Sequence, residues 1–161
     1  MFHFAPSSLG AHRPSAVPSW NDEGGSALRS RSILLVDDDE IDRILFVSAL
    51  KRVDPYVTCI TMPSADHAMR WLAENRADLA IVDLRMPGRS GFELIEDIRH
   101  APEHSEMPIT VLSTSSAEND RRRAIDLGAV RYFTKPASRA EYGTLASEFV
   151  AMLDDDDGRE M

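Results

Sequence analysis

The chain is poor in cysteine, in positive charge and in long apolar runs, and each shortage excludes a class of protein. Cys59 is the single cysteine among 161 residues, so no disulfide can form within the chain. Lysine and arginine total 18 against 27 aspartate and glutamate residues, and the net charge of −9 argues against binding to a nucleic-acid backbone. No apolar run is long enough to span a bilayer, and residues 1–20 lack the apolar stretch of a secretory signal. These absences predict a cytoplasmic protein whose partners are neither membranes nor nucleic acids.

Composition and charge divide the chain into one domain with a tail at each end. Residues 1–31 are rich in Pro, Ser, Gly and His without a helical or strand period, which predicts a disordered N-terminal extension. Residues 32–153 contain enough apolar residues for one packed core. Residues 154–161 hold five acids and one arginine and are predicted to be an acidic C-terminal tail in solvent. Because that tail leaves no room for an output domain, such as one that binds DNA, we expect the domain to act alone, by docking on other proteins.

Strand-like and helix-like patterns alternate between the two tails. Five short runs with the composition of buried strands are separated by segments whose apolar residues lie three and four apart, as in helices. The predicted strands are residues 33–36, 56–62, 79–82, 109–112 and 129–134. Such βα units predict a parallel sheet with helices on both faces, and right-handed crossovers favour the strand order 2-1-3-4-5. The predicted fold class is therefore α/β, a doubly wound five-stranded parallel sheet with the flavodoxin-like order.

Reactive polar side chains follow four of these runs, where each strand is predicted to end. They are Asp37, Asp38 and Asp39 after the first run, Asp83 after the third, Ser113 after the fourth and Lys135 after the fifth. Ligands of open parallel sheets bind outside the carboxyl ends of the strands. These carboxylates, the hydroxyl and the amine should therefore converge at one edge of the sheet.

The carboxylates among these groups suit a divalent cation and a phosphoryl group. Asp37, Asp38 and Asp83 would repel one another, and a cation with oxygen ligands, with Mg²⁺ as the expected cofactor, relieves that repulsion. Asp83 stands alone at its strand end, which makes it the better candidate for a nucleophile that takes a phosphoryl group as an acyl phosphate. Lys135 and the Ser113 hydroxyl could then neutralise the phosphoryl oxygens.

Each of these residues, taken alone, also has an ordinary structural interpretation. Asp39 could cap the next helix, Asp83 could be a loop or cap residue, and Ser113 could be a loop hydroxyl. Lys135 could be a solvated surface lysine. The functional interpretation depends on the groups appearing together at the ends of successive strands.

Several motifs make the chain resemble the receiver domains of two-component response regulators. The matching segments are ILLVDDD at 33–39, IVDLRMPG at 81–88, VLST at 111–114, LGA at 127–129 and YFTKP at 132–136. Each segment is weak alone, but their order and spacing are those of the family. The resemblance covers residues 32 to 153, nearly all of the predicted domain.

The resemblance implies a role for each acidic residue at the predicted site. Asp83 would be the phosphoacceptor. Asp37 and Asp38 would hold Mg²⁺ together with Asp83, and the backbone carbonyl of Arg85 would complete the ligands that the protein supplies.

The resemblance also implies a switch beside the phosphoacceptor. Ser113 stands at the position of the switch hydroxyl, and Tyr132 at that of the aromatic switch, which turns inward when the hydroxyl moves. The ordinary interpretation of Tyr132 is an aromatic residue at a sheet edge. Lys135 would contact the phosphoryl oxygens, and the peptide bond before Pro136 is expected to be cis.

Two residues beside the site depart from the common pattern of the family and are predicted to tune it. Arg85 is long and cationic at a variable position that sets the lifetime of the phosphorylated form. It could shield the acyl phosphate or steer the donor, and the direction of its effect stays open. Thr114 replaces a small residue and would narrow access to the site.

The function that the resemblance implies is a single-domain response regulator rather than an enzyme with a separate substrate. A sensor histidine kinase or phosphotransfer protein would supply the phosphoryl group. The face formed by the fourth helix, the fifth strand and the fifth helix would then bind an unidentified downstream protein or a second copy of the chain.

Two alternatives remain open at this point. The first is a receiver-fold module that binds partners without phosphorylation. The second is a phosphatase of the haloacid dehalogenase type, with Asp37 as nucleophile and Asp39 two residues later. Glu40 and Ile41 follow where that class prefers Gly-Thr or a similar pair, and the phosphatase leaves Asp83 unexplained.

Overall fold

Five parallel strands form one sheet in the computed structural model of the protein, in the order β2-β1-β3-β4-β5. They are β1 (Ser32–Val36), β2 (Thr58–Met62), β3 (Leu79–Val82), β4 (Ile109–Ser113) and β5 (Arg131–Thr134). The observed strand order confirms the predicted fold class. The second and fifth strands begin two residues later than the apolar runs predict.

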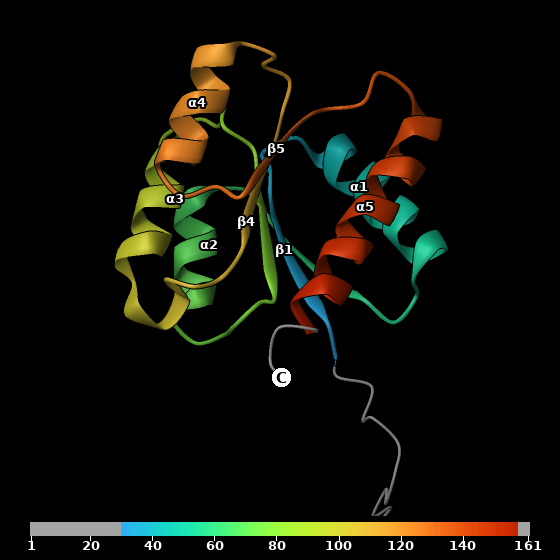
Figure 1. Ribbon diagram of the computed structural model, residues 1–161, viewed down its shortest axis with the longest axis horizontal. Coiled ribbons are helices and arrows are strands. Elements are labelled where there is room, and N and C mark those ends of the chain that lie inside the picture. The colour runs from blue at the N-terminus through green and yellow to red at the C-terminus, as the bar shows by residue number, and fades with distance from the viewer. Residues whose placement is uncertain (1–29, 158–161) are drawn as a thin grey trace, which may run out of the picture.

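Helices cover both faces of this sheet (Figure 1). The helices are α1 (Glu40–Val53), α2 (Ala65–Leu72), α3 (Gly91–His100), α4 (Glu118–Asp126) and α5 (Arg139–Asp157), with a short 3-10 helix η1 (Pro102–His104) after α3. Helices α1 and α5 lie on one face, and α2, α3 and α4 lie on the other. None of the helices within residues 30–157 is long and apolar enough to cross a membrane.

The core consists of two hydrophobic clusters separated by the sheet. Leu34 and Val36 point into the cluster under α2, α3 and α4, whereas Ile33 and Leu35 point into the cluster under α1 and α5. Phe149 of α5 is fully buried in the second cluster. Because both faces are covered, the central strands have no polar face, which explains their uniformly apolar sequences.

Side-chain caps mark the starts of α1, α2 and α3, and the caps of α1 and α3 lie near the site edge. Asp39 accepts hydrogen bonds from the N–H groups of Ile41 (2.8 Å) and Asp42 (3.2 Å), so it caps α1 as its ordinary interpretation predicts. Ser90 and Glu93 form a reciprocal capping box at the start of α3. Asp39 lies three residues after the end of β1 and Ser90 lies eight residues after the end of β3, so both caps belong to loops at the carboxyl edge of the sheet.

The structure describes residues 30–157. Most of the extension predicted for residues 1–31 and the last four residues of the tail predicted for 154–161 lie outside the described residues. Within them, α5 continues to Asp157, so the first part of the predicted tail is helical.

Arg31, which the sequence assigns to the extension, belongs to the folded part. Its carbonyl accepts a hydrogen bond from the Thr58 N–H (2.9 Å), and its guanidinium group forms ion pairs with Asp54 at the end of α1 and Asp154 in α5. This arginine therefore fastens the start of the sheet to both helices of one layer.

The peptide bond between Lys135 and Pro136 is trans, so the prediction of a cis bond is wrong. The trans isomer is the intrinsically favoured one, by about 0.5–1 kcal/mol. The N–H of Lys135 also donates to the Ser113 carbonyl (2.8 Å), which positions the lysine before the chain reaches the proline. The lysine side chain therefore reaches the sheet edge without the rarer isomer.

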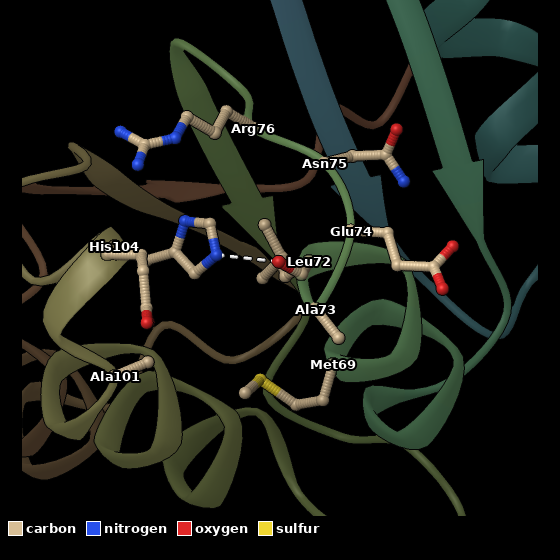
Figure 2. Close-up of a pocket in the computed structure, with 9 residues that line it drawn as sticks. Met69, Leu72, Ala73, Glu74, Asn75, Arg76, Ala101 and His104 are labelled. Carbon is tan, nitrogen blue, oxygen red and sulfur yellow. Dashed lines mark hydrogen bonds between the residues drawn. The ribbon is translucent and has the colours of Figure 1, made fainter.

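A hollow between the ends of α2 and α3 lies away from the carboxyl ends of the strands (Figure 2). The buried His104 points from η1 toward α2, and its Nε2 lies 2.7 Å from the Leu72 carbonyl oxygen. Because a carbonyl can only accept, the imidazole Nε2–H donates. This hydrogen bond holds η1 against the end of α2, and it gives the ring nitrogen of the buried His104 a partner.

Gly91 allows the start of α3 to approach the main chain at the end of β3. A Cβ at this position would lie 2.2 Å from the carbonyl oxygen of Asp83 and 2.7 Å from the Cα of Leu84. These are main-chain atoms, which cannot rotate away as a flexible side chain can. The segment after Asp83 therefore depends on the absence of a side chain at position 91.

We predict that Gly91→Ala lowers the free energy of unfolding by about 1–3 kcal/mol, because the added methyl group overpacks this contact. Gly143→Ala in α5 is the matched control, since its Cβ would meet no atom within 4 Å. That substitution should raise stability by about 0.5–1 kcal/mol through helix propensity. Urea denaturation of both variants measures the difference, and equal effects would contradict the close approach.

Candidate functional site

The carboxyl ends of the strands bring the predicted side chains together at one edge of the sheet. Asp37 follows β1, Asp83 follows β3, Ser113 ends β4 and Lys135 follows β5. Main-chain hydrogen bonds continue the ladder into this edge, because the Asp83 N–H donates to the Val36 carbonyl (2.9 Å). The backbone therefore holds the carboxylates and the amine in register.

The three predicted metal ligands form one cluster. One carboxylate oxygen from each of Asp37, Asp38 and Asp83 lies within 4.8 Å of the others. Asp37 and Asp83 are only 2% and 5% exposed, whereas Asp38 is exposed. Hard oxygen donors with one side open to water are what Mg²⁺ requires, since it keeps several water ligands. The donor set therefore fits Mg²⁺.

Lys135 supplies the positive charge at the centre of this cluster. Its Nζ lies 2.8 Å from Asp37 Oδ2, 3.2 Å from Asp83 Oδ2 and 2.7 Å from Asp42 Oδ2. The lysine side chain is 8% exposed, so the ordinary interpretation as a solvated surface lysine is wrong. The lysine is paired with carboxylates from both the sheet edge and α1.

Burial and ion pairing act against each other on these charges. Burial raises the pKa of Asp37 from 3.8 to about 6, although Lys135 and the Asp39 N–H both lower it. For Lys135 the balance is the reverse. Burial lowers its pKa, but hydrogen bonds to Asp37 and Asp42 outweigh that effect and raise the pKa above its usual range. Lys135 therefore stays charged, whereas for Asp37 the effect of burial prevails and disfavours the charged carboxylate.

Asp42 is a site residue that the sequence did not single out. The apolar spacing predicts that Ile41 and Ile44 belong to the buried stripe of α1, but they are 68% and 57% exposed. The inward side of the helix instead carries Asp42 and the buried Phe46. The spacing of four residues from Asp42 to Phe46 carries this signal, but an acidic residue does not count in a search for apolar residues.

The predicted switch residues meet at Ser115, in the loop before α4. Ser113 is fully buried, and its Oγ accepts a hydrogen bond from the Ser115 N–H (3.2 Å). The Tyr132 hydroxyl donates to the Ser115 carbonyl (2.7 Å). The ring of Tyr132 is buried, and its role as an aromatic switch stays a prediction.

The side chain of Arg85 points away from the carboxylates. Its N–H donates to Asp83 Oδ1 (3.3 Å), but its guanidinium group is 69% exposed and bonds Asp120 of α4 (3.1 Å). The Ser115 hydroxyl donates to the same oxygen of Asp120 (2.6 Å). Arg85 is therefore connected through Asp120 to the loop that follows Ser113, and Thr114 in this loop is exposed. The carbonyl of Arg85 as a metal ligand stays a prediction.

Comparison with known proteins identifies a family and several relatives. A family model described as the response regulator receiver domain matches residues 33–145. The transcriptional regulatory protein GltR of Pseudomonas aeruginosa is 41% identical over 111 residues, which cover 69% of this chain and 45% of that protein. The cyclic di-GMP phosphodiesterase response regulator RpfG of Xanthomonas campestris is 25% identical over 138 residues, covering 86% and 36%. The chain thus spans less than half the length of these two relatives.

Two solved structures that match the fold are response regulators. The phosphorylated cyanobacterial phytochrome response regulator RcpA matches with a TM-score of 0.70 and 28% identity over 74% of this chain and 90% of that one. The chemotaxis response regulator CheY4 of Vibrio cholerae matches with a TM-score of 0.66 and 23% identity over 76% and 98%, a likeness of fold alone. These matches favour the receiver over the phosphatase alternative.

We predict that the metal-free Asp37→Asn variant is more stable than the wild type at pH 7.5, by about 1–3 kcal/mol. Because the folded-state pKa of Asp37 is raised to about 6 from 3.8, the cost is absent below pH 3.8 and complete above pH 6. Asparagine does not titrate, so the difference between variant and wild type should vanish as the pH falls toward 4. Urea denaturation across this range tests it, and a difference independent of pH would be the contrary result.

Proposed function

Since this chain belongs to the response regulator receiver domain family, we propose that it is a phosphorylation-dependent signalling module whose phosphoacceptor is Asp83. The observation that carries the proposal is the position of Asp83, which is a buried carboxylate 3.2 Å from Lys135 Nζ and within reach of two other acids. Its activity would be confined to its own phosphorylation and dephosphorylation, without a separate substrate.

The proposed reaction transfers a phosphoryl group to an Asp83 oxygen. That oxygen attacks phosphorus, the bond to the donor breaks, and the donor keeps the electron pair. Mg²⁺ held by Asp37, Asp38 and Asp83, with the Arg85 carbonyl as a further proposed ligand, would supply positive charge to the phosphoryl oxygens. Lys135 would neutralise another of these oxygens, since its ammonium group already lies against the carboxylate that reacts.

In the proposed switch, the main chain of Ser115 connects the side chains of Ser113 and Tyr132. If the Ser113 hydroxyl turns to donate to a phosphoryl oxygen, it no longer accepts the Ser115 N–H. The carbonyl of the same Ser115 holds the Tyr132 hydroxyl, so a movement of the loop also alters the partner of the aromatic ring. One residue thus couples the two switch side chains, which supports a shift of the face formed by α4, β5 and α5.

We further propose that Arg85 restrains this switch instead of shielding the acyl phosphate. Its guanidinium group bonds Asp120, and Asp120 also accepts from the Ser115 hydroxyl. The arginine and the loop therefore share one carboxylate, which favours the resting position of Ser115. Thr114, exposed beside Ser113, is proposed to narrow the approach to the site.

Exposed apolar side chains lie on two surfaces, and we propose that each binds a different protein partner of this cytoplasmic module. Ile41 and Ile44 project from α1 beside the site, where a sensor histidine kinase or phosphotransfer protein would dock to deliver the phosphoryl group. Ile125 of α4 and Val130 before β5 are exposed on the proposed output face. That face would bind an unidentified downstream protein or a second copy of the chain.

The phosphoacceptor is tested by incubating the protein with Mg²⁺ and acetyl phosphate and weighing it intact. We expect a mass gain of one phosphoryl group that is absent in Asp83→Asn and absent when the cation is chelated. Asp37→Asn serves as the control for charge loss at the site, and it should slow labelling without removing the acceptor. Labelling that depends on Asp37 and proceeds without Asp83 would indicate the phosphatase. No labelling by acetyl phosphate or by a kinase would indicate the phosphorylation-independent module.

If Arg85 restrains the loop of residues 113–117 through Asp120, both Asp120→Ala and Arg85→Ala should loosen this loop. Loss of one such hydrogen bond, worth about 0.5–1.5 kcal/mol, corresponds to a rise of about two- to tenfold in amide exchange over residues 113–117. Labelling by acetyl phosphate should become faster in both variants.

Glu118→Ala is the matched control for this test, because it removes an acid from the same turn of α4. It should leave the exchange of the loop unchanged. Slower labelling in Arg85→Ala would instead favour an arginine that steers the donor.

A further inference from the structure

We propose that Asp42 is a positioning residue that holds Lys135 at the phosphoryl site. Asp42 lies in the first turn of α1, and its Oδ2 is 2.7 Å from Lys135 Nζ, the shortest of the three contacts between this ammonium group and carboxylates. The inference rests on the proposed phosphoryl transfer to Asp83. It adds a fourth carboxylate to a site in which three are assigned to the cation.

Asp42 differs from the other two partners of Lys135 because it is not part of the carboxylate cluster that fits a cation. That cluster consists of Asp37, Asp38 and Asp83. When Asp37 and Asp83 share their negative charge with a cation, their attraction for the lysine falls. The full charge of Asp42 then remains for Lys135, so Asp42 determines where the ammonium group rests before the phosphoryl group arrives.

A second contact fixes Asp42 itself. The hydroxyl of Tyr142 donates to Asp42 Oδ1 (3.3 Å), and Tyr142 is buried in the layer between α1 and α5. Burial raises the pKa of Tyr142 to about 12, and the negative charge of Asp42 adds to that shift. One oxygen of Asp42 therefore contacts Lys135, and the other accepts a hydrogen bond from Tyr142 of α5.

The position of this charge has two opposite consequences. An extra negative charge near the carboxylate cluster attracts a cation. Asp42 also shares the charge of the Lys135 ammonium group with Asp37 and Asp83, which weakens the competition between the lysine and the cation for their oxygens. The same charge repels an anionic phosphodonor. It also keeps one N–H of the Lys135 ammonium group bonded to Asp42, so that this N–H is not free to donate to a phosphoryl oxygen. Asp42 should therefore strengthen cation binding and slow phosphoryl transfer.

The two predicted effects of Asp42→Asn thus run in opposite directions. The Mg²⁺ dissociation constant should rise about two- to fivefold, while the labelling rate with acetyl phosphate at saturating Mg²⁺ should rise about three- to tenfold. Damage to the fold would weaken both functions together. Isothermal titration with Mg²⁺ and time-resolved intact mass measure the two quantities on the full chain.

The chain offers a direct spectroscopic measurement, because it contains only two lysines, Lys51 and Lys135. Labelling the lysine side chains with ¹³C gives two Cε–H signals in an NMR spectrum, with the exposed Lys51 as an internal reference. The Lys135 signal should move in Asp42→Asn and should move in the same direction, by less, in Tyr142→Phe. Neither substitution should move the Lys51 signal.

Glu40→Gln is the matched control, since it removes one negative charge from the same turn of α1 at an exposed position. The proposal is overturned if Asp42→Asn and Glu40→Gln give the same Mg²⁺ affinity and the same labelling rate. It is also overturned if the Lys135 signal stays in place in Asp42→Asn. If the wild type accepts no phosphoryl group, the proposed function fails, whereas the Mg²⁺ titration and the lysine signal still decide whether Asp42 positions Lys135.

Discussion

The edge of the sheet depends on the burial of two carboxylates around one ammonium group. Asp37 and Asp83 are almost fully buried, and Lys135 reaches both of them. Taking carboxylates out of water is costly, and the raised pKa of Asp37 indicates that the lysine offsets this cost only in part. A site left with surplus negative charge is suited to a divalent cation, and in the proposed function the same lysine then contacts the oxygens of a phosphoryl group.

The rest of the fold holds that arrangement in place and connects it to the helices. Parallel strands end together at one edge, and Gly91 lets α3 close against the main chain of Asp83. Two connections lead outward from the edge. One passes through Ser115 to Tyr132, and the other passes through Asp42 toward α5. The edge is thus linked to α5 through Lys135, Asp42 and Tyr142, and the loop after Ser113 is linked to β5 through Tyr132.

The strands and the residues at the site edge could be predicted from the sequence, because both leave a local pattern. Uniformly apolar runs identified the buried strands, and polar residues directly after them identified the site edge. Two expectations failed for physical reasons. The bond before Pro136 is trans, although a cis bond was expected. The sequence does not decide between the two isomers, because they differ by only about 0.5–1 kcal/mol. The inward side of α1 includes Asp42 in place of Ile41, because the partly buried ion pair between Asp42 and Lys135 takes the place of an apolar contact.

Periodicity and the rules for parallel sheets are enough to infer the fold class, the strand order and the set of residues at the strand ends from the amino-acid sequence. Which side chains meet across long separations depends on the packed structure. Lys135 lies 93 positions from Asp42, and Arg85 lies 35 positions from Asp120. Such pairs leave no local pattern, because they depend on how α1 and α4 are rotated on the sheet, and that rotation is set by the packing of the whole core.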